Sequence, residues 1–178
     1  MIHPVWSVYD EYRTLRLNVN YYRCKLGYAV RVNFIVECLI AATSSTAVGG
    51  LWFFSTAAGG VVWKILATLA ALLSVYQTVA KPSDIVRKLE ETVTAFSTVE
   101  ADIEKLCRKI KTDGRYTKPM MREFEALVEK RVEISHKYMD AKVNKNLRAH
   151  CTEEVLKQLP LESFYIPPPE VRDDTHEK

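Results

Sequence analysis

Two long apolar runs, separated by a short segment of small residues, constrain the fold more than any other feature of the sequence. The first is FIVECLIAATSSTAVGGLWFF, residues 34–54, and the second is VVWKILATLAALLSVYQTVA, residues 61–80. Each run is about 20 residues long, the length that crosses ~30 Å of hydrocarbon as an α-helix. The STAAGG segment between them has room only for a turn. We therefore predict a transmembrane helical hairpin over residues 33–80.

The turn of this hairpin is expected at STAAGG, where Gly59 and Gly60 can adopt the positive φ angles of tight turns. A buried helical hairpin of a soluble protein is the alternative, because the same apolar runs would form it. Aromatic residues favour the membrane, since they gather at membrane interfaces. Those that flank the turn are Trp52, Phe53, Phe54 and Trp63.

Positive charges flank the hairpin on one side. Arginine and lysine residues precede the first run and follow the second, whereas the turn carries no charge. Cytoplasmic loops of membrane proteins are enriched in these residues, so we expect both termini to be cytoplasmic. The whole chain has 178 residues, is 48% hydrophobic and has a net charge of +3, which is too small to indicate nucleic-acid binding.

No motif has the spacing of a catalytic or metal site. The glycine-rich segments lack the Lys-Ser/Thr pair of a phosphate-binding loop, and the four cysteines show no C-x-x-C spacing. Glu133 and His136 form an E-x-x-H pair, but a di-iron site in a helical bundle needs a second pair. We therefore expect no catalytic residue, no metal and no cofactor, and we predict that the protein is not an enzyme.

The polar residues of the first run fall on two opposite faces of a helix. Asn33, Glu37 and Ser44 share one face and are candidates to line a pore. Small residues let helices approach closely in lipid, so they mark candidate packing positions. These are Thr43, Thr46 and Gly50 in the first run, and Ala67, Ala71, Ser74 and Thr78 in the second, together with Lys64, which shares their face of the second run.

Residues 83–159 are predicted to form a cytoplasmic helical hairpin. Ser83 is the expected cap of its first helix, which should end at Asp113-Gly114. Apolar residues recur there at steps of three and four, which predicts a coiled coil between copies of the chain, with an intramolecular bundle as the alternative. They are Ile85, Leu89, Phe96, Val99, Ile103, Leu106 and Ile110.

The other segments are assigned from the same patterns. Residues 1–32 read as an amphipathic cytoplasmic helix. The second helix of the cytoplasmic hairpin should begin near Pro119 and fade near His150, followed by a short helix capped by Thr152. Residues 160–178 are proline-rich and then charged, which predicts a flexible tail. The fold class is therefore an all-α membrane protein.

This layout resembles the SLATT family of bacterial two-span effector domains. The matching features are the helix YDEYRTLRLNVNYYRCKLGYAVRVNF, the tight two-span hairpin and the helix DIVRKLEETVTAFSTVEADIEKL. The resemblance implies a homo-oligomeric effector of the bacterial inner membrane that acts in antiviral defence. It also implies a separate sensor or a protein that produces a nucleotide signal, because no sensor domain is visible in this sequence.

Two functions follow from these features. In the first, the chain forms a pore or disrupts the membrane, which the polar faces and Glu37 favour. In the second, the spans only anchor a coiled-coil scaffold that recruits a cytoplasmic partner. The polyproline segment FYIPPPE favours the scaffold, because such segments dock into aromatic grooves.

Overall fold

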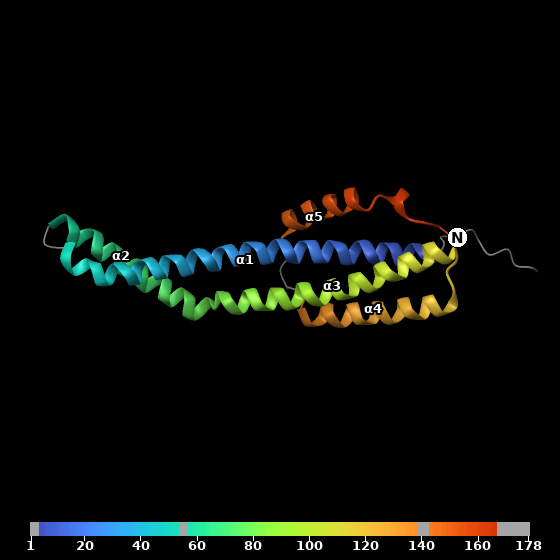
Figure 1. The fold of residues 1–178 in the computed structure, drawn as a ribbon, viewed down its shortest axis with the longest axis horizontal. Helices are drawn as coiled ribbons and strands as arrows, with labels where there is room; N and C mark the ends of the chain where they lie inside the picture. Colours follow the sequence, from blue (N-terminus) through green and yellow to red (C-terminus); the bar gives the residue numbers. More distant parts are fainter. Residues whose placement is uncertain (1–3, 54–56, 139–142, 167–178) are drawn as a thin grey trace, which may run out of the picture. The chain divides into compact units, whose positions relative to one another are not determined.

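The computed structural model describes residues 4–53, 57–138 and 143–166, with the side chains of 43–53, 57–64, 66 and 67 left out of the description. These residues form helices and contain no strand, so the prediction of an all-α fold is confirmed. The elements in order are α1 (Val5–Phe53), α2 (Ala57–Ala80), α3 (Pro82–Asp113), α4 (Lys118–Tyr138), α5 (Lys145–Gln158) and the short 3-10 helix η1 (Leu161–Ser163) (Figure 1).

The chain divides into two compact units. The bundle unit comprises Met1–Arg23 and Glu91–Lys178, and the hairpin unit comprises Cys24–Glu90. The divisions fall inside α1 and α3.

The core of the bundle unit forms between the first part of α1 and the second part of α3. Leu15 and Val19 of α1 are completely buried, as are Phe96 and Ile103 of α3. The ring of Tyr22 stacks on Phe96 with centroids 5.7 Å apart and an interplanar angle of 9°. These apolar residues recur at helical spacing, so one stripe of each helix faces the other.

Ion pairs fix the register of these helices. Arg16 of α1 contacts Glu100 of α3 at 2.6 Å, and Glu100 is only 5% exposed. Together with the Tyr22–Phe96 contact, this pair requires α1 and α3 to run antiparallel. A second pair joins Arg131 of α4 to Glu11 of α1 at 2.7 Å.

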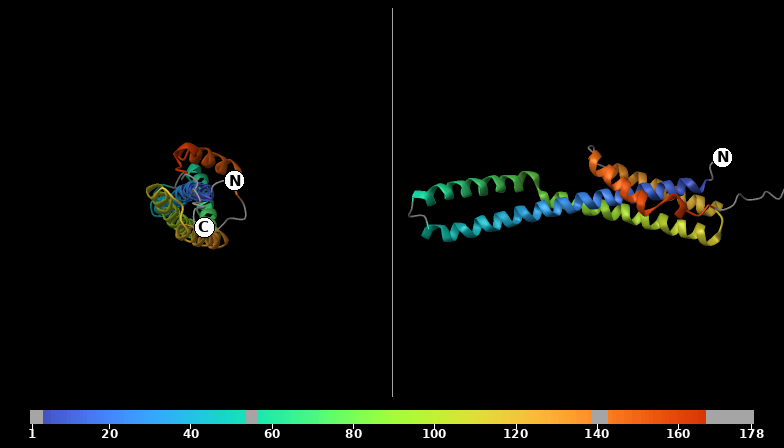
Figure 2. Two further views of the ribbon diagram at one scale, coloured as in Figure 1. Left: turned by 90° about the vertical axis from the view of Figure 1, so that its right-hand side faces the viewer. Right: turned by 90° about the horizontal axis from the view of Figure 1, so that it is seen from above.

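Helices α4 and α5 complete the bundle unit. Lys109 of α3 contacts Glu123 of α4 at 2.9 Å, so these two helices form an antiparallel pair that follows the chain (Figure 2). Helix α5 lies along α1, where the Tyr21 hydroxyl accepts a hydrogen bond from the Asn144 backbone N–H at 3.0 Å. Helix α1 therefore has a neighbour in each of the other three helices of the unit.

The apolar stripe of α3, which was predicted to form a coiled coil between copies, is mostly buried within the bundle unit. Phe96, Val99, Ile103, Leu106 and Ile110 are 0% exposed inside the bundle unit, where the Tyr22 ring of α1 stacks on Phe96. Two other members of the predicted seam lie in the hairpin unit, where Ile85 is 47% exposed and Leu89 is half-buried. This burial favours the intramolecular bundle over a coiled coil between copies.

Helix ends confirm some sequence predictions and correct others. Helix α3 ends at Asp113, and Gly114 takes a φ of 66°, as the Asp-Gly signal predicts. The prediction that Ser83 caps α3 was wrong, because α3 begins one residue earlier, at Pro82. The prediction that Thr152 caps the short helix was also wrong, because Thr152 lies inside α5. Asn144 caps α5, and its side chain accepts a hydrogen bond from the Leu147 N–H.

The hairpin unit consists of the second part of α1, helix α2 and the start of α3. Helix α2 begins at Ala57, so Gly59 and Gly60 lie in its first turn. The predicted turn at these two glycines was therefore wrong, because both lie inside a helix. Among the residues that are described, we find no helix with the length and apolar character needed to cross a membrane.

The predicted flexible tail, residues 160–178, is ordered over its first part. Helix η1 spans Leu161–Ser163, and the Ser163 hydroxyl donates a hydrogen bond to the Pro160 carbonyl at 2.7 Å. Phe164 and Tyr165 then contact α1 within the bundle unit. The rest of the tail, residues 167–178, lies outside the description.

Candidate functional site

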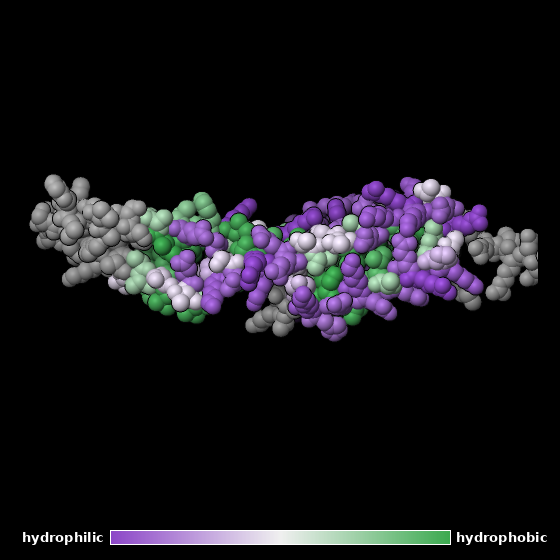
Figure 3. All heavy atoms as spheres, turned by 60° about the horizontal axis from the view of Figure 1, so that its bottom comes forward, coloured by the Kyte–Doolittle hydropathy of each residue, from purple (hydrophilic) through white to green (hydrophobic). Residues whose placement is uncertain are grey.

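The hairpin unit presents large apolar side chains to its surface. Val79 is 77% exposed and Tyr28 is 74% exposed, whereas Leu15 of the bundle unit is 0% exposed. Figure 3 shows hydrophobic residues reaching the surface where α1 and α2 run together, and a mostly hydrophilic surface over α3 and α4. The other strongly exposed apolar residues of the hairpin unit are Phe34, Ile35, Ile65, Leu72 and Val75.

The candidate pore residues Asn33 and Glu37 lie one helical turn apart on α1. The Asn33 side-chain amide donates a hydrogen bond to the Glu37 carboxylate at 2.8 Å, and Glu37 is exposed. The structure therefore brings these two residues together on one face. The side chain of Ser44, the third candidate, lies outside the description.

The candidate packing positions of α2 are exposed where they are described. Ala71, Ser74 and Thr78 all lie at the surface of the hairpin unit. The Thr78 hydroxyl donates to the Ser74 carbonyl at 2.9 Å, so its polar group is satisfied within the helix. The side chains of the remaining candidates, Thr43, Thr46, Gly50, Lys64 and Ala67, lie outside the description.

An aromatic contact that the sequence analysis missed joins the chain's C-terminal segment to α1. Tyr9 stacks on Phe164 with centroids 4.4 Å apart, and its hydroxyl donates to the Tyr165 carbonyl at 2.5 Å. Arg13, one turn further along, lies over the Phe164 ring at 5.1 Å and donates from Nε to the Leu159 carbonyl at 3.1 Å. Burial, the main cause, raises the pKa of Tyr9 to about 12.

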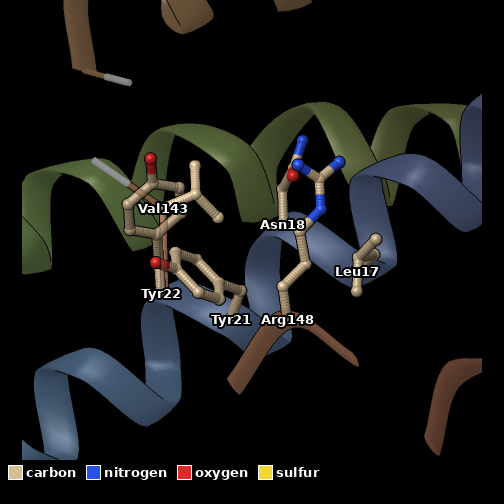
Figure 4. A pocket seen from close by; sticks show the side chains of 6 residues that line it. All are labelled: Leu17, Asn18, Tyr21, Tyr22, Val143 and Arg148. Carbon is tan, nitrogen blue, oxygen red and sulfur yellow. The ribbon is translucent and has the colours of Figure 1, made fainter. Parts of the chain in front are cut away.

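One small pocket opens between α1 and α5 in the bundle unit (Figure 4). Its volume is about 20 Å³, which suffices for a single water molecule. It is therefore too small for an organic ligand or a nucleotide. The residues that line it are Leu17, Asn18, Tyr21, Tyr22, Val143 and Arg148.

The titratable side chains singled out in the sequence lie apart in the described structure. The described side chains contain no group of three or more His, Cys, Asp or Glu residues that could hold a metal ion. Glu133 and His136 are both exposed on α4. Burial raises the pKa of the Cys107 thiol to about 12, so this cysteine stays protonated at neutral pH and is a poor nucleophile.

Comparisons with protein-family models, with curated proteins and with solved structures find no match to this chain. The resemblance to the SLATT family therefore rests on the sequence pattern alone. The feature that best distinguishes a functional surface in this molecule is the exposed apolar surface of the hairpin unit.

Proposed function

We propose that the protein is an oligomeric effector of the bacterial inner membrane, whose hairpin unit enters the bilayer and forms a pore or disrupts it. Both termini and the bundle unit stay in the cytoplasm. A separate sensor, or a protein that produces a nucleotide signal, triggers the effector. The observation that carries the proposal is the apolar surface of the hairpin unit, with Val79 and Tyr28 more than two-thirds exposed at 77% and 74%.

A surface of this kind needs an apolar environment. Apolar area costs about 25 cal/mol per Å² when it is left in water, and large exposed patches mark membrane or protein contacts. Lipid supports the proposal better than a protein partner does, because the apolar runs 34–54 and 61–80 have the length of membrane spans.

We place the contacts between copies in the hairpin unit. The apolar stripe of α3 is occupied inside the bundle unit, where Phe96 and Ile103 are 0% exposed. Ala71 and Ser74 of α2 are exposed and small, which suits close helix packing in lipid. Thus Ala71→Leu is expected to weaken the oligomer in detergent, as measured by its mass, while leaving the bundle unit folded.

Glu37 is the residue we assign to ion passage. An ionised carboxylate facing lipid costs about 2.5–3.5 kcal/mol by insertion scales, so a water-filled path is a favourable place for it. A ring of such carboxylates attracts cations. We therefore expect purified protein in liposomes to pass cations in preference to anions.

The test is ion flux through liposomes containing wild-type protein, Glu37→Gln or Glu37→Lys. The Gln variant should lose cation preference and the Lys variant should reverse it, because the charge of the ring is removed and then inverted. Glu129→Gln is the matched control, since Glu129 is an exposed carboxylate of α4. Unchanged selectivity in all variants would contradict the role of Glu37.

A membrane-anchored scaffold is the second candidate function. The observation that favours it is the bundle unit itself, which buries its own apolar stripes and pairs its own helices through Arg16–Glu100 and Arg131–Glu11. Stable insertion of the protein without any ion flux, even after a partner is added, would support the scaffold over the pore.

A further inference from the structure

We propose that the base of the hairpin unit is a binding surface for the headgroups of anionic phospholipids. The surface consists of Arg31, Lys81 and Tyr28, and is called the headgroup surface below. This inference rests on the proposed function, because it requires the hairpin unit to be inserted in a bilayer. It goes beyond the proposed function by naming anionic phospholipids as the lipids that the inserted protein prefers.

Arg31 and Lys81 lie at similar depths along the hairpin unit. At a rise of ~1.5 Å per residue, Arg31 lies roughly 33 Å before the end of α1 at Phe53, and Lys81 lies roughly 36 Å beyond the start of α2 at Ala57. The hydrocarbon core of a bilayer is ~30 Å thick. Both cations thus fall at the level of the phosphate groups when the turn reaches the far side.

The headgroup surface carries positive charge. Arg31 and Lys81 are exposed, and neither makes an ion pair with any other residue in the described part of the chain. The nearby carboxylates have partners of their own: Asp84 contacts Arg87 at 3.6 Å, and Glu37 accepts a hydrogen bond from Asn33 at 2.8 Å. The two cations are therefore available to an external anion.

The backbone of Lys81 adopts an unusual conformation for a lysine. Its φ is 42°, in the left-handed region that glycine and asparagine enter more readily than lysine does. Lys81 is the single residue between α2 and α3, and its carbonyl accepts hydrogen bonds from the Asp84 and Ile85 N–H groups at 2.9 and 3.3 Å. A strained lysine at this junction indicates a use for its charge there.

The chemistry of the three residues fits a phospholipid headgroup. Arginine can donate two parallel hydrogen bonds to a phosphate, and lysine supplies a compact positive charge. Tyr28 is 74% exposed, and tyrosine gathers at the level of headgroups in membrane proteins. A bilayer presents many phosphates at this level, so each cation can contact a headgroup.

The experiment compares recovery of the purified protein in floated vesicles after detergent removal. One set of vesicles contains phosphatidylcholine alone, and the other contains phosphatidylcholine with added phosphatidylglycerol. We expect the wild-type protein to favour the anionic vesicles, and each cation to contribute about fivefold. Inorganic phosphate at matched ionic strength should not abolish the preference.

The test variant is Arg31→Gln with Lys81→Asn, because asparagine keeps the left-handed backbone without the charge. It should lose the preference while keeping wild-type helix content by circular dichroism. The Arg31→Lys variant should keep most of the preference for anionic vesicles, because lysine retains the positive charge. The matched control is Arg115→Gln with Lys118→Asn, which removes two exposed cations from the bundle unit and should leave the preference intact.

The outcomes separate the two claims. Recovery in both kinds of vesicle without a lipid preference, or an equal preference in wild type and the test variant, would overturn the headgroup surface alone. Displacement by inorganic phosphate would also overturn it, because the surface would then be a simple anion site. Recovery in neither kind of vesicle would overturn the proposed function and the headgroup surface together.

Discussion

The bundle unit and the hairpin unit use the same kinds of apolar residue in opposite ways. Val19 of the bundle unit is 0% exposed, whereas Val79 of the hairpin unit is 77% exposed. The bundle helices are apolar on one stripe and charged elsewhere, so packing stripe against stripe satisfies them. Helix α2 is apolar around most of its circumference, so one neighbouring helix cannot cover it.

The two units also differ in how their charges are paired. In the bundle unit, Arg16–Glu100 and Arg131–Glu11 join residues from different helices at 2.6 and 2.7 Å. In the described part of the hairpin unit, Arg87–Asp84 is a contact within one helical turn. The bundle unit thus has contacts between helices that specify one arrangement, whereas the described part of the hairpin unit leaves large apolar side chains exposed.

The largest expected effect comes from emptying the bundle core. Phe96→Ala removes a fully buried ring that stacks on Tyr22, so it should lower the free energy of unfolding by about 3–5 kcal/mol. Val79→Ala at a 77% exposed position should change it by no more than about 0.5 kcal/mol. Denaturant titration of the detergent-solubilised protein measures both. Similar losses for the two variants would erase the distinction between the units.

A smaller effect is expected from breaking the buried ion pair. Glu100→Ala leaves Arg16 without its partner, which should cost about 2–3 kcal/mol of unfolding free energy, less than for a fully buried pair because the Arg16 side chain is 34% exposed. The double variant Arg16→Met with Glu100→Leu should recover most of the loss. The same titration tests this, and a double variant no more stable than Glu100→Ala would contradict the assignment.

The smallest effect concerns the contact between α1 and the C-terminal segment. Tyr9→Phe removes the hydrogen bond to the Tyr165 carbonyl and should cost about 1 kcal/mol of unfolding free energy at neutral pH. The pKa of Tyr9 is raised from 10.0 to about 12, so its contribution is complete below pH 10.0 and is lost as the pH rises towards about 12.

The pH dependence separates Tyr9 from other titrating groups. Between pH 10.0 and about 12, the Tyr9→Phe protein should lose less stability than the wild type, because phenylalanine cannot ionise. Denaturant titration at several pH values in this interval measures the difference. Parallel curves for the two proteins would show that Tyr9 does not carry this dependence.

The sequence predicted the helices well because their apolar spacing is local information. The end of α3 at Asp113-Gly114 and the start of α4 near Pro119 are of this kind. The partner of the α3 stripe could not be predicted, since a coiled coil between copies and an intramolecular bundle need the same spacing. The choice depends on α1, which the chain brings back from far away in the sequence.

The misses have similar causes. The stacking of Tyr9 on Phe164 joins residues 155 positions apart in a segment whose prolines favoured a flexible tail. Gly59 and Gly60 were predicted to form a turn because glycine adopts turn conformations readily. In the structure both lie in the first turn of α2, where glycine is tolerated at a modest entropic cost. For the candidate site, Asn33 and Glu37 were placed on one face by helical spacing, and their hydrogen bond agrees with it.

Site-directed cysteine labelling tests the central claim, that the hairpin unit crosses the membrane while the bundle unit stays in the cytoplasm. Cys107 is a poor reporter because burial raises its pKa to about 12, so the four native cysteines are first replaced. Ala58→Cys then reports on the start of α2, and Arg122→Cys reports on an exposed position of α4. We predict that a membrane-impermeant maleimide labels Ala58→Cys in intact bacterial cells and labels Arg122→Cys only after permeabilisation. Protection of both cysteines until the cells are permeabilised, or labelling of Arg122→Cys from outside, would contradict the account.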